Sequence, residues 1–216
     1  MKYIMPSSCQ IANLSELYET YFGSVRIGTF VDVGAHDGIT FSNTRGLAEA
    51  GWKGMCFEPL PELYEKLHSL YPDDGIVKAY DCCVGDKDGI TKLYLGENPT
   101  IDIETVRKQP WGTPYSEENY ILRTVVTLDQ MLLEFCADSG FEVLSIDVEG
   151  AELQVLQGFD IEYWKPQMVI IETHEGNVDS RKSFHAVEIN KYFSDFSYVK
   201  IQVDGLNTIY MRKDLM

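Results

Sequence analysis

Hydrophobic residues recur along the chain with two different spacings, which predict helices and strands in alternation. Leu14, Leu17 and Tyr21 lie three or four positions apart, as on one face of a helix. Short apolar runs such as the one around Val31 and Val33 have the length and composition of buried strands. Helices are predicted at residues 13–22, 43–50, 61–71, 128–136, 151–156 and 185–193. Strands are predicted at residues 30–33, 53–58, 77–84, 90–95, 141–147, 166–173, 197–203 and 207–212.

This alternation predicts an α/β protein with a mostly parallel sheet covered by helices on both faces. The turn at residues 204–206 lies between the last two strands and predicts a C-terminal antiparallel hairpin. With 216 residues and a hydrophobic fraction of 44%, we expect one domain over 1–216. Residues 1–27 are expected to form an N-terminal helical extension of this domain.

Residues 97–123 are the least regular section. They contain three prolines and three aromatic residues, namely Pro99, Pro110, Pro114, Trp111, Tyr115 and Tyr120. A long loop in a compact domain is usually functional or disordered, and aromatic content argues against disorder. We therefore expect a lid or an acceptor wall here, with a plain packed excursion as the alternative.

The net charge of −16 and the pI near 4.5 argue against nucleic acids and anionic membranes as partners, because such a surface repels both. Five cysteines without a C-x-x-C pair indicate reduced thiols. No apolar run has the length of a signal peptide or a membrane span, so we expect a cytoplasmic protein.

The stretch from Gly28 to Gly38 is the strongest local signal, because a strand that ends at Gly34 and leads into a helix is a common nucleotide site. The spacing does not fit the dinucleotide pattern G-x-G-x-x-G. Asp32 stands where that pattern needs its first glycine, and its last glycine would fall one position before Gly38. A carboxylate here suits a cationic or hydroxyl-bearing ligand, and S-adenosylmethionine carries both an amino group and ribose hydroxyls.

The next two strands end in further polar residues. Glu58, followed by Pro59, ends the strand after the first helix of the β-α-β unit, where an acid can accept hydrogen bonds from both ribose hydroxyls. NAD sites use an acid at the same place, so Glu58 indicates a ribose without naming the cofactor. At the third strand, Asp81 can accept from an adenine amino group, and Cys82 or Val84 can pack on the ring.

Four segments together resemble one known family. They are residues 31–35 (V-D-V-G-A), 57–59 (F-E-P), 146–152 (I-D-V-E-G-A-E) and 170–172 (I-I-E), and they are supported by T-L-D at 127–129, K-P at 165–166 and D-G-L-N at 204–207. With these segments the chain resembles the FkbM-type S-adenosylmethionine-dependent methyltransferases from about residue 29 to residue 212. The resemblance implies a seven-stranded, Rossmann-like class I methyltransferase fold and O-methylation of a hydroxyl on a small molecule, sugar or glycan.

The resemblance also implies roles for individual residues. Asp32 and Gly34, with Ala35 beside them, are expected to contact the methionine end of the cofactor, and Glu58 its ribose. Asp147, at the end of the fourth major strand, is expected to face the transferred methyl group. His36 departs from the family pattern, in which a small or amide residue is common, so it is a candidate contact to either cofactor or acceptor.

An alcohol is a poor nucleophile, so O-methylation requires a base or a metal ion beside the acceptor. His174, which follows the fifth major strand, is the leading candidate for the base because its pKa suits proton acceptance near neutrality. Asp147, Glu149, Glu172 and His174 form an alternative oxygen-rich metal site of the kind that catechol-type methyltransferases use. The sequence offers no compact ligand motif, so no metal is expected.

Two other functions remain open at this point. One is a non-catalytic module that binds S-adenosylmethionine, and the other is an NAD-dependent oxidoreductase, which Asp32 disfavours. Glu149 and Glu152 can also serve simply to cap the helix that follows them. The sequence does not identify the acceptor or the oligomeric state.

Overall fold

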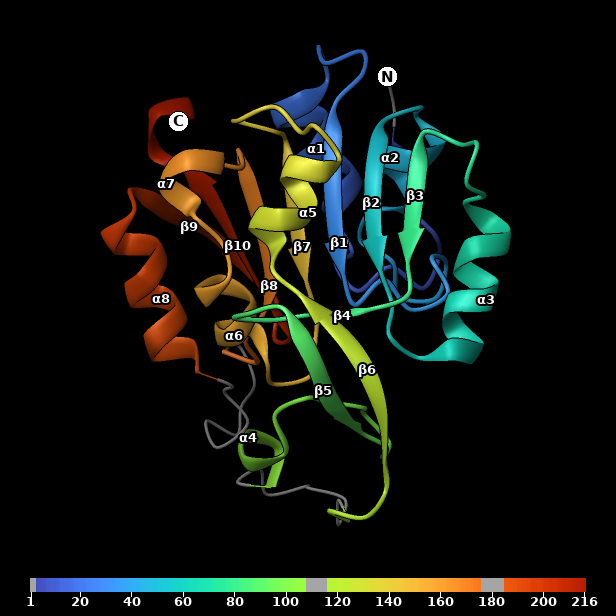
Figure 1. Ribbon diagram of the computed structural model, residues 1–216. Helices are drawn as coiled ribbons and strands as arrows, with labels where there is room; N and C mark the ends of the chain where they lie inside the picture. The colour runs from blue at the N-terminus through green and yellow to red at the C-terminus, as the bar shows by residue number, and fades with distance from the viewer. Residues whose placement is uncertain (1–2, 108–115, 176–184) are drawn as a thin grey trace.

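A computed structural model describes residues 3–107, 116–175 and 185–216 and shows a seven-stranded sheet between two layers of helices (Figure 1). The strands of this sheet are β1 (Thr29–Val33), β2 (Lys53–Phe57), β3 (Val77–Tyr80), β7 (Val143–Ile146), β8 (Met168–Glu172), β9 (Tyr198–Val203) and β10 (Asn207–Arg212). Their order is β3-β2-β1-β7-β8-β10-β9, and β10 alone runs in the direction opposite to the other six strands. The predicted fold class and the C-terminal hairpin are confirmed.

Helices bury both faces of the sheet because the strands carry apolar residues on both sides. One face packs on α5 (Leu128–Glu134), α6 (Glu152–Gln157), α7 (Ile161–Trp164) and α8 (Ala186–Asp195). The other face packs on α1 (Leu14–Phe22), α2 (Arg45–Glu49) and α3 (Pro61–Leu70). Along β1 the two faces alternate: Val31 and Val33 join the first core, and Phe30 joins the second.

A second, three-stranded sheet lies beyond the carboxyl ends of the main strands (Figure 1). It consists of β4 (Cys83–Val84), β5 (Gly89–Tyr94) and β6 (Tyr120–Val126), with β6 in the middle. Residues 77–84 therefore form two strands in two sheets, and not the single strand expected. The irregular section is also shorter than residues 97–123, because α4 (Ile103–Arg107) and the first residues of β6 are regular.

Some elements end at other residues than predicted, as at residues 128–136, where α5 ends at Glu134. Asn13 precedes α1 but does not cap it, because its side chain exchanges hydrogen bonds with Gln202 on β9. The short helix α7 had no prediction. Pro110, Trp111, Pro114 and Tyr115 of the expected lid lie outside the described residues. In the part of the chain that is described, no helix is both long and apolar enough to span a bilayer.

Candidate active site

A cavity of about 500 Å³ opens where the carboxyl ends of β1, β2 and β7 meet. Residues 96–101 and the loop after β1 form much of its opposite wall. The predicted cofactor residues that line it are Asp32, Gly34, Ala35, His36, Glu58, Pro59, Cys82 and Asp147. This volume lies within the usual range of ligand pockets, about 300–1,000 Å³. Residues that the sequence places at the ends of the strands therefore line one cavity.

The backbone amides of the glycine turn after β1 form hydrogen bonds with the end of β2 and the residue after it. The N–H groups of Gly34 and Ala35 both donate to the carbonyl oxygen of Phe57, at 3.0 and 2.9 Å. The next amide, that of His36, donates to Glu58 Oε2 at 3.0 Å. A dinucleotide site needs such amides to face the pyrophosphate. In this turn they are used to join β1 to β2.

Asp32 lies at the floor of the cavity and is only 5% exposed. The hydroxyl of Thr44 donates to Asp32 Oδ2 at 2.6 Å, and Ser145, its register partner on β7, also hydrogen-bonds to this carboxylate. Burial outweighs these bonds, and together with the nearby charge of Asp147 it raises the pKa of Asp32 to about 6. Asp32 is therefore a buried carboxylate that gains from a cationic ligand.

Glu58 is fixed in orientation by two backbone amides, one on each oxygen. His36 N–H donates to Oε2, and Leu60 N–H donates to Oε1 at 2.9 Å. A carboxylate offers about four lone-pair positions, so each oxygen keeps one for a ligand hydroxyl. Burial raises the pKa of Glu58 above its ordinary value. The geometry suits a vicinal diol such as that of a ribose.

The structure does not bring Asp81 to the cavity. Because β3 ends at Tyr80, the chain turns at Asp81 toward the second sheet, and the Asp81 carboxylate forms an ion pair with Arg123 on β6. Cys82, by contrast, is buried in the cavity wall, and burial raises the pKa of its thiol to about 12. Asp81 thus joins the two sheets, whereas Cys82 offers an uncharged, apolar surface.

Gln10, from the N-terminal extension, lines the cavity although nothing in the sequence singled it out. Its Nε2 donates to Asp147 Oδ2 at 2.9 Å. Its Oε1 accepts from Asn43 at 2.9 Å and from Asn207 at 3.1 Å. One amide thus links the extension to three separate parts of the chain, so the extension forms part of the site wall in addition to the helical layer.

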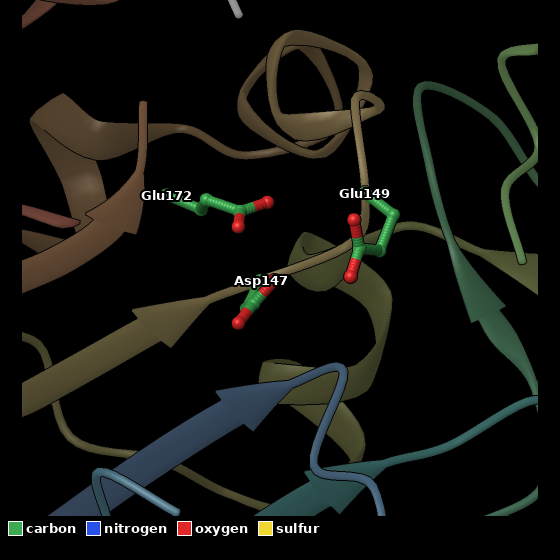
Figure 2. Close-up of side chains that lie close together, drawn as sticks. All are labelled: Asp147, Glu149 and Glu172. Atoms are coloured by element: carbon green, nitrogen blue, oxygen red, sulfur yellow. The ribbon is translucent and has the colours of Figure 1, made fainter. Parts of the chain in front are cut away.

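Asp147, Glu149 and Glu172 converge at the end of the cavity beyond β7 (Figure 2). Glu172 reaches in from β8, Glu149 from the turn after β7, and Asp147 lies between them (Figure 2). Glu149 has a left-handed backbone (φ 57°), a costly conformation for this residue type that is typical of functional turns. Burial and the charge of Asp147 raise the pKa of Glu149 to about 8, and burial also raises the pKa of Asp147 and of Glu172.

His174 and Glu152 stand behind this cluster. His174 Nε2 lies 3.1 Å from Glu172 Oε1, and neither His174 nor Glu172 lines the cavity. Glu152 Oε1 accepts from the amides of Val148 and Gly150 at 3.2 and 3.1 Å, so it holds the turn before α6. The side chain of Glu172 therefore separates His174, the predicted base, from the cavity wall.

Comparison with known proteins relates this site to one family. A match to the methyltransferase FkbM domain spans residues 32–200. The chain belongs to the FkbM methyltransferase family. The match includes all the strand ends of the cavity and the carboxylate cluster, and it excludes Gln10.

The chain is also similar to two other methyltransferases. Methyltransferase sdnD from Sordaria araneosa is 31% identical over 171 residues, which are 67% of this chain and 66% of the relative. The FkbM methyltransferase structure from Methylobacillus flagellatus superimposes with a TM-score of 0.54 at 17% identity, and covers 90% of this chain and 47% of the other. The chain thus spans about two thirds of the first relative and about half of the second.

Membership of the FkbM family implies S-adenosylmethionine as the cofactor, and the cavity fits this molecule. Asp32 supplies a buried carboxylate for an ammonium group, and Glu58 supplies oriented oxygens for a diol. Leu60, Leu63 and Val84 give the cavity an apolar side on which a purine ring can pack. Charge, hydrogen-bond acceptors and apolar surface are therefore all present for the three parts of the cofactor.

Proposed function

We propose that this chain is an S-adenosylmethionine-dependent O-methyltransferase that acts on a hydroxyl of a small molecule, sugar or glycan. The observation that carries the proposal is the order of side chains along one cavity. Glu58, Asp32 and Asp147 follow one another across the carboxyl ends of the adjacent strands β2, β1 and β7. This order suits a cofactor that lies across the strand ends with its reactive end toward β7.

On the cofactor side, Asp32 binds the amino group and Glu58 binds the ribose hydroxyls. Ala35, His36 and Pro59 form the adjoining wall, and Cys82 packs against the adenine ring. Asp81 is left out of this binding set because it pairs with Arg123. When bound, S-adenosylmethionine supplies an electrophilic methyl group.

On the acceptor side, Asp147 and Glu149 face the cavity and can accept a hydrogen bond from a hydroxyl group. This bond aligns the acceptor oxygen and favours removal of its proton during the transfer. Residues 96–101 cover the same end, and Asn98 hydrogen-bonds to Glu149. We assign this segment to the acceptor wall. The acidic surface favours a neutral or cationic acceptor over nucleic acid.

Calorimetric titration with S-adenosylmethionine and with NAD tests the cofactor side. We expect S-adenosylmethionine to bind and NAD not to bind. Glu58→Gln removes the charge but keeps the size of the side chain. It should raise the Kd of S-adenosylmethionine about 10-fold, the order expected for loss of a charge-assisted hydrogen bond. Glu62→Gln, on the first turn of α3, is the matched control and should bind normally. Binding of NAD alone would sink the proposal, and binding without transfer to any hydroxyl acceptor would indicate a binding module.

His174 is proposed to act through Glu172, as a positioning residue for the cluster. His174→Ala should therefore leave the Kd of S-adenosylmethionine unchanged and lower the methylation kcat about 10-fold, within the range of supporting polar groups at active sites. His174→Gln, which can still donate to Glu172, should restore part of the rate. The pH dependence of kcat distinguishes this role from a purely structural one. An unchanged rate in His174→Ala would remove His174 from the mechanism.

A further inference from the structure

The convergence of Asp147, Glu149 and Glu172 has the dimensions of a cation site. One carboxylate oxygen from each residue lies within 4.8 Å of the other two. Two oxygens bound to one ion at 2.1–2.4 Å are separated by at most about 4.2–4.8 Å, the range for Mg²⁺ and Ca²⁺. One ion can therefore reach all three carboxylates once their side chains draw slightly together.

Among the described residues the cluster carries more negative charge than its neighbours can neutralise, because the three carboxylates pair with a single imidazole, that of His174. Gln10 binds Asp147 and Asn98 binds Glu149, and both are neutral amides. Within residues 3–107, 116–175 and 185–216, no lysine or arginine forms an ion pair with the three carboxylates. Like charges this close cannot all be ionised without a compensating ion or a bound proton.

A buried oxygen without a donor gives independent support. Glu172 is 5% exposed, and among the described residues outside the cluster no group donates a hydrogen bond to its Oε2; within the cluster, its carboxylate meets that of Asp147. Its carboxylate is directed toward Asp147 and Glu149 (Figure 2). An unsatisfied buried carboxylate oxygen is costly, and its persistence calls for an explanation such as an ion.

We propose that Asp147, Glu149 and Glu172 bind one divalent cation, Mg²⁺ or Mn²⁺, at the acceptor end of the cavity. Three hard oxygen ligands suit these ions, which complete their shells with water or substrate oxygens. Gln10 fixes the Asp147 carboxylate, and His174 fixes that of Glu172, as outer partners of metal ligands do.

The role of the ion rests on the proposed function. Asp147 and Glu149 line the cavity, so an ion between them is within reach of an acceptor hydroxyl. Coordination there orients the hydroxyl oxygen and lowers its pKa, which favours loss of its proton to solvent or to a carboxylate. The proposal is thus that the acceptor site is built around a cation.

Mn²⁺ binding to the whole chain without S-adenosylmethionine tests the site directly. Paramagnetic resonance of free Mn²⁺ should show one ion bound per chain, with Mg²⁺ competing. Glu172→Gln removes the charge of one ligand, at a residue outside the cavity wall. It should raise the Kd of Mn²⁺ about 10-fold or more. Glu175→Gln, three residues on, is the matched control because Lys200 already pairs with this carboxylate at 2.7 Å.

Thermal unfolding keeps the test valid if a variant folds poorly. At 100 times its wild-type Kd, Mg²⁺ should raise the wild-type Tm by about 5–10 °C, and at the same Mg²⁺ concentration this rise should fall to about half or less in Glu172→Gln. The Kd of S-adenosylmethionine should change little in that variant, which separates this test from that of the proposed function. No Mn²⁺ binding, or equal binding in Glu172→Gln, would overturn the cation site while leaving S-adenosylmethionine binding intact.

Discussion

Asp32→Asn should weaken S-adenosylmethionine binding and at the same time stabilise the free protein. The buried carboxylate is the proposed partner of the cofactor amino group, and losing a charge-assisted bond of this kind costs about 10- to 100-fold in Kd. The same carboxylate is only 5% exposed and ionises near pH 6, against 3.8 ordinarily. Holding it ionised in the folded state at pH 7.5 therefore costs up to about 3 kcal/mol.

The two effects have opposite signs and a defined pH window. Because the pKa of Asp32 is raised on folding, the destabilisation is absent below pH 3.8, grows between pH 3.8 and about 6, and is complete above. We expect Asp32→Asn to raise the Tm at pH 7.5 by about 2–10 °C, and to lose this advantage near pH 4. In the wild type, affinity for S-adenosylmethionine should fall as the pH drops through about 6.

Asp37→Asn is the matched control, since it lies in the same turn but outside the cavity wall. Burial acts to raise the pKa of Asp37, but hydrogen bonds from Thr40 and Ile39 prevail and lower it to about 2. This substitution should lower the Tm at neutral pH and leave cofactor binding unchanged. Calorimetric titration and thermal unfolding across pH check both variants. A wild-type Kd in Asp32→Asn would contradict the assigned role.

The sequence located the part of the cavity formed by the strand ends because that part is built from local signals. Apolar runs that end in Asp32, Glu58 and Asp147 predict parallel strands, and parallel strands place their carboxyl ends on one edge. The strand order was therefore enough to bring these side chains together. The spacing around Gly34 argues against a turn that binds a pyrophosphate. The structure agrees, because the amides of Gly34 and Ala35 already donate to the carbonyl oxygen of Phe57.

Local sequence patterns do not predict most contacts between distant segments. Gln10 meets Asp147 across 137 positions of sequence, and a lone polar residue ahead of a helix carries no mark of this contact. The grouping of Glu149 with Glu172 follows from their strand ends, but the left-handed backbone of Glu149, which this residue type adopts rarely, has no signal in the sequence. The position of Asp81 outside the cavity wall has a similar origin, because its pairing with Arg123 depends on a second sheet that the sequence does not predict.

Gly34→Ala should cause a large loss of stability. Gly34 has φ 87°, and a Cβ atom there would overlap the backbone carbonyl oxygen of Asp147. A backbone atom at the end of β7 cannot move aside unless β1 and β7 separate, and these strands are paired at Val33 and Ile146. We expect the free energy of unfolding to fall by more than about 3 kcal/mol, the order of severe core overpacking, or the chain not to fold.

Gly51→Ala separates the clash from the backbone conformation. Gly51 has nearly the same φ, 84°, but a Cβ atom there would meet nothing within 4 Å beyond its chain neighbours. This control should cost only about 1–2 kcal/mol, the penalty for a left-handed alanine. Denaturant unfolding of both variants measures the difference. Equal losses would mean that close contact between the turn and β7 is unimportant. A larger loss at Gly34 would show that the fold depends on the close approach of this turn to the backbone of Asp147.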